Sequence, residues 1–157
     1  MKDAVRESLS YWGLFGKMLQ VKKEVEPKCI PFGGHKHQYF LYYEPKSVKS
    51  NTIIMWVHGG GWNAGTPKQF DFVGQCAAKN GYRFVSIGYR LSPKNKYPCQ
   101  IEDVCAGYKV AVEFLAKNRI DASRLVISGS SAGAHLAAIL CCSEKTQEKL
   151  DVDVKIV

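Results

Sequence analysis

Two glycine-rich segments, each placed directly after a strand-like run, constrain the fold of this chain more than any other feature. The first is His58-Gly59-Gly60-Gly61-Trp62, which follows the apolar run 52–57. The second is Gly129-Ser130-Ser131-Ala132-Gly133, which follows the run 124–128. In parallel sheets the carboxyl ends of the strands meet at one edge, where ligand sites gather. The two segments are therefore predicted to lie close together at that edge.

The rest of the chain alternates between strand-like and helix-like patterns. We expect strands at 38–43, 52–57, 83–89, 125–128 and 152–157, and helices at 68–80, 101–118 and 131–142. The apolar positions of the 101–118 segment recur on one helical face, and Gly81 is a natural stop for the helix before it. This alternation predicts an α/β fold, a doubly wound and mostly parallel sheet with helices on both faces.

Length and composition indicate one globular domain. The 157 residues are 46% hydrophobic and 23% charged, which are ordinary globular values. We expect residues 1–20 to form a helical or cap segment and residues 21–157 to belong to a single domain. No run approaches the roughly 18 apolar residues that span a bilayer. Because the first 20 residues also lack the pattern of a signal peptide, we expect a cytoplasmic protein.

Charge and cysteine usage point away from nucleic acid and metal. The net charge is +8, but the excess is diffuse and forms no basic stripe with interleaved aromatic residues. We therefore expect no nucleic-acid partner. The six cysteines form no CxxC pair and no Cys/His group at metal-ligand spacing, so we expect structural thiols, no metal and no cofactor. Cys141 and Cys142 are expected inside a buried helix.

The second glycine segment suits a serine nucleophile. A serine hydroxyl attacks a carbonyl only when a base takes its proton and the chain presents it to the substrate. A sharp strand-to-helix turn at Ser131 would present the hydroxyl in strained backbone geometry. Gly129 and Gly133 would leave room for the close approach of neighbouring chain at this turn. Ser131 is therefore the candidate catalytic residue.

The first glycine segment suits an oxyanion hole. Backbone N–H groups aimed at the negative oxygen of a tetrahedral intermediate lower the barrier for acyl transfer. Gly60 and Gly61 could supply such groups, and Ala132 offers another at the start of the helix. We expect His58 to shape this loop rather than to act as the base. Trp62 either lines a substrate pocket or covers the loop.

Together with these motifs, four further segments give the sequence a family resemblance: Gly88–Pro93, Tyr97-Pro98, Glu102–Val104 and Asp121–Arg124. Over about residues 37–157 the chain resembles the α/β-hydrolases of the hormone-sensitive-lipase type. The feruloyl-esterase-like (BD-FAE) and kynurenine-formamidase-like groups are close by. The resemblance implies Ser131 as nucleophile and Gly60, Gly61 and Ala132 as the oxyanion hole. We expect structural roles for Tyr89-Arg90 and Glu102-Asp103.

The catalytic acid and base of that family are not found in this chain. In the α/β-hydrolase fold an Asp or Glu and then a His follow the nucleophile. The only histidine after Ser131 is His135, which we expect to be a packed core histidine. The resemblance also implies further strands and helices, so we expect these 157 residues to be the N-terminal portion of a longer hydrolase, incomplete at the C-terminus and inactive alone.

Three functional hypotheses remain at this stage. The first is a carboxylesterase that cleaves small esters through an acyl-serine intermediate. The second is a catalytically inactive fragment or a ligand-binding protein on a hydrolase scaffold, and the third is an amidase of the arylformamidase type. The sequence leaves the acyl group, the alcohol and the oligomeric state open.

Overall fold

The computed structural model describes residues 21–154 of the chain. The helix expected over residues 1–20 and the last three residues lie outside this range. The strands are β1 (Lys28–Pro31), β2 (Tyr39–Tyr43), β3 (Ile53–Val57), β4 (Arg83–Ile87) and β5 (Leu125–Gly129). The helices are the 3₁₀ turn η1 (Pro67–Phe70), α2 (Asp71–Lys79), α3 (Cys99–Lys117), α4 (Ala132–Cys142) and α5 (Glu144–Leu150).

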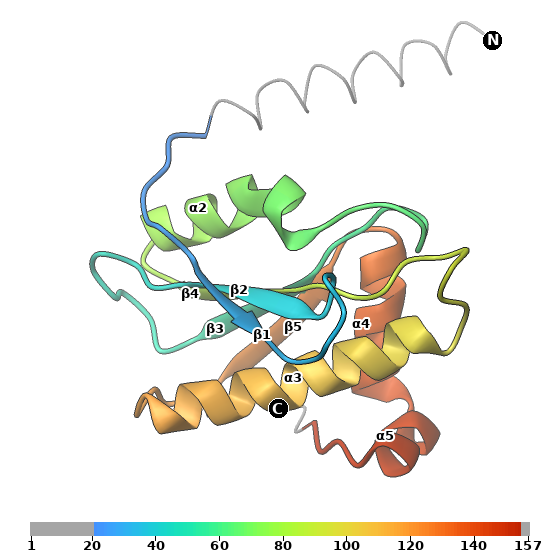
Figure 1. Ribbon diagram of the computed structural model, residues 1–157. Coiled ribbons are helices and arrows are strands. Elements are labelled where there is room, and N and C mark those ends of the chain that lie inside the picture. Colours follow the sequence, from blue (N-terminus) through green and yellow to red (C-terminus); the bar gives the residue numbers. More distant parts are fainter. Residues whose placement is uncertain (1–20, 155–157) are drawn as a thin grey trace, which may run out of the picture.

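The five strands form one sheet in the order β1-β2-β4-β3-β5 (Figure 1). The last three in this order run parallel, as the pattern predicted, whereas β1 and β2 are antiparallel additions at one edge. Val57, the last residue of β3, lies in register with Gly129 at the end of β5. The carboxyl ends of the two motif-bearing strands are therefore side by side, which confirms the central expectation of the sequence.

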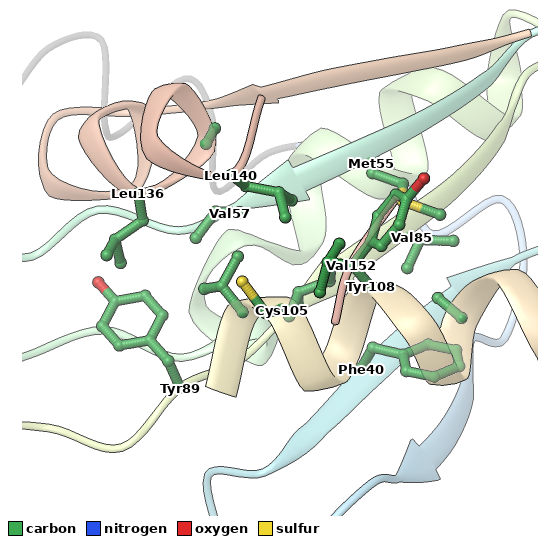
Figure 2. Packing of buried hydrophobic residues seen from close by; sticks show 14 of the residues in the cluster. Phe40, Met55, Val57, Val85, Tyr89, Cys105, Tyr108, Leu136, Leu140 and Val152 are labelled. Carbon is green, nitrogen blue, oxygen red and sulfur yellow. The ribbon is translucent and has the colours of Figure 1, made fainter. Parts of the chain in front are cut away.

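Helices cover both faces of the sheet, with α2 on one face and α3 and α4 on the other (Figure 1). The larger core lies under α3 and α4, where side chains such as Met55, Val57 and Leu136 pack together (Figure 2). The smaller core lies under α2 and contains Leu41 and Phe84. Alternate residues of β3 serve the two cores, because successive side chains of a strand point to opposite faces.

Several details of the fold differ from the sequence-based expectations. Strand β1 and helix α5 were not predicted, and residues 152–154 are not in a strand. Val152 instead packs into the larger core from irregular chain, with 7% of its surface exposed (Figure 2). Cys142 is exposed and Cys141 is half-buried, so the expectation that both are buried is wrong.

Among the described residues, no helix combines the length and apolar character needed to cross a bilayer.

Candidate active site

Ser131 lies at the sharp turn between β5 and α4. Its backbone angles are φ 49° and ψ −120°, a conformation that a residue with a Cβ rarely adopts. Such strain persists only where the surrounding structure enforces it, and it is common at functional sites. The side chain is exposed, and its Oγ makes no hydrogen bond within residues 21–154. The turn therefore presents an exposed hydroxyl with no hydrogen-bond partner among the described residues. We call residues 129–133 the nucleophile turn, after the role expected for Ser131.

The two glycines that flank this turn allow a very close approach of α4 to the end of β3. A Cβ on Gly133 would overlap the backbone carbonyl oxygens of Val57 and His58. A Cβ on Gly129 would lie 2.6 Å from the backbone carbon of Gly133 and 2.7 Å from the oxygen of Val57. Real Cβ atoms do not come this close to backbone, so both positions require glycine. The glycine spacing thus reflects packing of backbone on backbone.

One hydrogen bond joins the two glycine segments. The N–H of Gly59 donates to the Oγ of Ser130 at 3.1 Å, and a Cβ on Gly59 would lie 2.7 Å from the backbone oxygen of Ser130. Ser130 is therefore the side chain that holds the first loop against the nucleophile turn. Sequence reasoning missed this role, although the doubled serine of the motif was a visible signal.

Beyond Gly59 the loop passes through three successive residues with positive φ, of which the first two are glycines and the third is Trp62, with φ 62°. Gly60 has φ +124° and Gly61 has φ +57°, both in the region that favours glycine. The carbonyl of Gly60 accepts hydrogen bonds from the N–H groups of Asn63 and Ala64, at 3.1 and 2.9 Å. No hydrogen bond within residues 21–154 uses the N–H of Gly60, Gly61 or Ala132. These three N–H groups are therefore unpaired among the described residues, and Gly61 also lines the cavity next to this loop.

His58 is fully buried and lies at the start of the glycine loop, residues 58–62. Its ring stacks on Tyr89 with the centroids 4.2 Å apart, and its Nδ1 lies 2.9 Å from the oxygen of Gly59. The hydroxyl of Tyr89 donates to the carbonyl of His58 at 3.0 Å. These contacts agree with the expected loop-shaping role. No contact joins the imidazole to Ser131, so the ring is not placed to act as its base.

Burial lowers the pKa of His58 to about 4 from its usual value of 6.5. The unfolded chain then binds this proton at a higher pH than the folded protein, so stability is lost as the pH falls from 6.5 towards 4. Between pH 7 and pH 4.5 we expect this group to remove about 2 to 3 kcal/mol from the free energy of unfolding. Urea unfolding of the wild type and of His58→Gln over this range measures it. An equal pH slope in both proteins would contradict the assignment.

His135 is not the core histidine that the sequence predicted. It is exposed on α4, one turn after Ser131, and its backbone N–H donates to the carbonyl of Ser131 at 3.1 Å. Its ring meets the ring of Trp62 edge-on, with the centroids 5.6 Å apart and the planes at 86°. The side chain that was expected to fill the core instead lines a cavity.

A cavity of about 300 Å³ opens beside the nucleophile turn. Its walls come from residues 61–62 of the glycine loop, from the segment 92–100 and from residues 135–136 of α4. Trp62 is 40% exposed and lines this cavity, and its role in binding a substrate stays a prediction. Ser131 does not line the cavity itself, but it lies one helical turn before His135, which does.

The predicted structural role of the Arg90 and Asp103 segments is confirmed. The buried carboxylate of Asp103 accepts from the Nε and Nη2 of Arg90 at 2.8 and 2.7 Å, and also from the backbone N–H of Arg90 at 2.7 Å. Gln38 donates to the same carboxylate at 2.8 Å. The network fixes α3 against the ends of β4 and β2.

Within residues 21–154, no group of three or more His, Cys, Asp or Glu side chains could hold a metal ion.

Comparison with known proteins identifies the family. The family model named BD-FAE matches residues 41–157, which is most of the chain. The chain belongs to the BD-FAE family. The match covers both glycine segments and every strand from β2 onward except the first two residues of β2, so the resemblance stated from the sequence is confirmed.

Relatives of this BD-FAE member carry esterase names. It is 30% identical to "Carboxylesterase NlhH" of Mycobacterium tuberculosis over 118 residues, which are 74% of this chain and 37% of the relative. It is also 30% identical to "Ethyl acetate hydrolase" of Pseudomonas putida over 137 residues, 82% of this chain and 43% of the relative. The chain therefore spans less than half the length of these curated relatives.

Solved structures confirm the fold of this BD-FAE member. An esterase of Pyrobaculum calidifontis superposes with a TM-score of 0.70 at 27% identity, over 96% of this chain and 49% of the esterase. Esterase B of Lactobacillus rhamnosis gives a TM-score of 0.76 at 24% identity, over 98% of this chain and 52% of that chain. The described residues thus form an incomplete α/β-hydrolase fold, as the sequence predicted.

Proposed function

We propose that this protein hydrolyses small carboxylic esters through an acyl-serine intermediate on Ser131. The observation that carries the proposal is the strained, exposed Ser131 beside three unused N–H donors, on two loops joined by the Gly59–Ser130 hydrogen bond. The esterase names of the relatives support the same chemistry. An ester substrate would enter by the cavity that Trp62 lines.

The proposed reaction has two steps, acylation of Ser131 and hydrolysis of the acyl-serine. The Oγ of Ser131 forms a bond to the ester carbonyl carbon while a base takes its proton, and the carbonyl oxygen becomes negative. The N–H groups of Gly60, Gly61 and Ala132 would hold this oxygen, each contributing about 3 kcal/mol to the lower barrier. Collapse breaks the bond to the alcohol, which leaves with the proton. Water then attacks the acyl-serine and releases the acid.

The base is the part of this mechanism that residues 21–154 do not provide. No hydrogen bond joins a histidine side chain to Ser131 in this part of the chain, and the four histidines of the sequence all lie within it. His58 is held by its stacking on Tyr89, and His135 packs edge-on against Trp62. We propose that the acid and base come from outside the described residues.

Covalent labelling tests the proposal. The protein as its own gene expresses it is treated with a fluorophosphonate probe, digested with trypsin and analysed by mass spectrometry. We expect the adduct on Ser131, within the tryptic peptide 125–145. Hydrolysis of 4-nitrophenyl butyrate and of the matching 4-nitroanilide then compares ester with amide, and we expect the ester to react faster.

Serine variants of the same peptide provide the controls. Ser131→Ala is expected to abolish both the labelling and the hydrolysis. Ser130→Ala keeps the nucleophile but loses the bond to Gly59, so we expect slower labelling that still maps to residue 131. Labelling that persists unchanged in Ser131→Ala would refute the assignment. A wild-type protein that is not labelled would favour a binding protein on a hydrolase scaffold.

A further inference from the structure

One side chain gives the cavity beside Ser131 a charge. Lys96 lines the cavity, and no carboxylate does. Within residues 21–154 no ion pair involves Lys96. The nearby guanidinium of Arg90 is already neutralised by Asp103. Lys96 is exposed, and it is the one Lys or Arg among the residues that line this cavity.

The backbone around Lys96 is held in place. The carbonyl of Lys96 accepts from the N–H of Cys99 at 3.0 Å, and Gln100 donates from its side chain to the carbonyl of Asn95 at 2.6 Å. Gln100 is itself 3% exposed. The N–H of Ser92 donates to the carbonyl of Trp62 at 2.9 Å, which joins this segment to the glycine loop. The backbone that carries Lys96 is thus held in place at the wall of the cavity.

The rest of the cavity suits the organic part of a small ligand. Trp62 and Leu136 supply apolar surface, and the ring of Tyr97, which is 72% exposed, lies next to Lys96 in the chain. Pockets that bind small molecules combine apolar walls with a few polar groups that fix orientation. Helix α3 begins at Cys99, and the partial positive charge of a helix start adds to that of Lys96.

We propose that the preferred substrate is an ester that carries a carboxylate, which Lys96 binds in this cavity while the ester carbonyl lies at Ser131. The placement of the ester carbonyl at Ser131 rests on the proposed function. The binding of the carboxylate by Lys96 does not depend on it. A charge-assisted hydrogen bond from Lys96 is available to an anionic ester and not to a neutral one of similar size.

Binding measured without turnover tests the inference. Ser131→Ala protein is titrated with monoethyl succinate, which is anionic, and with diethyl succinate, which is neutral. Quenching of Trp62 fluorescence reports occupancy, and Trp62→Phe in the same background should remove the signal. We expect the anionic ester to bind roughly tenfold more tightly, the size of one hydrogen bond to a charged group. Raising the salt concentration should reduce this preference.

Lysine variants separate Lys96 from general charge effects. Lys96→Gln should bind both esters equally, whereas Lys96→Arg should keep the preference. Lys94→Gln is the matched control, because Lys94 lies in the same segment but does not line the cavity. Circular dichroism checks that each variant is folded.

The inference would be overturned if the Ser131→Ala protein bound the two esters equally or bound neither. It would also be overturned if the preference for the anionic ester survived Lys96→Gln. Quenching that persists in Trp62→Phe would do the same. A preference that depends on Lys96 in a protein whose Ser131 is not labelled would refute the proposed function and leave the carboxylate site standing.

Discussion

Replacing Gly133 with alanine is expected to lower the free energy of unfolding by about 3 kcal/mol, at the upper end of the cost of overpacking. On an exposed helix the same substitution would stabilise, because alanine is the better helix former. Here the added Cβ would overlap the carbonyl oxygens of Val57 and His58, which are backbone atoms and cannot rotate away. Relief requires α4 to move off the end of β3.

Urea unfolding followed by circular dichroism measures the change. Gly34→Ala is the matched control, because a Cβ on Gly34 meets nothing within 4 Å and its effect should stay within about 0.5 kcal/mol. The same displacement of α4 would move Ser131 away from the glycine loop. We therefore also expect slower fluorophosphonate labelling of any Gly133→Ala protein that remains folded. Equal stability of the two variants would show that the helix start is not as tightly packed as described.

Asp103→Ala is expected to cost about 3 to 5 kcal/mol, the usual result of removing one partner of a buried ion pair. The Asp103 side chain is 2% exposed and accepts hydrogen bonds from Arg90 and Gln38. Without it, donors from both residues lose their acceptor in a partly buried place. Asp103→Asn retains acceptor capacity but loses the charge, so we expect an intermediate loss.

Glu102→Ala is the matched control for this pair. The Glu102 carboxylate lies 3.8 Å from Nη2 of Arg90 with 40% of its side chain exposed, and exposed pairs contribute at most about 1 kcal/mol. Equilibrium unfolding of the single variants and of the Arg90→Ala/Asp103→Ala double variant gives the coupling between the partners. We expect the double variant to lose less than the sum of its parts. Additive losses would mean that the two side chains act independently.

Strands and helices with a strong apolar pattern were predictable from the sequence. Strand β3 is short, apolar and buried, and α3 repeats its apolar residues on one face, so both were placed to within two residues. The nucleophile turn was predictable for a different reason. Glycine at 129 and 133 is required by backbone contacts, and that requirement is visible in the sequence as a motif.

Elements without such a pattern were missed. Strand β1 is mostly exposed at the edge of the sheet, and α5 has no buried residue, so neither shows a periodic apolar face. For helix α4 the element was predicted correctly, but the burial of some of its side chains was not. Its sequence is apolar or small almost all round, which hides the direction of its buried face and explains the errors at His135 and Cys142. The cavity wall at Lys96 depends on three segments that only the fold brings together.

The carboxyl end of β3 serves both halves of the site at once. The carbonyl of Val57 accepts from the N–H of Ser130 at 3.3 Å, and the next residue, His58, begins the glycine loop. The proposed nucleophile turn and the proposed oxyanion loop are thus both attached to the carboxyl end of β3. A displacement of this strand end is therefore expected to move the two segments in the same direction, so that their spacing changes less than their position.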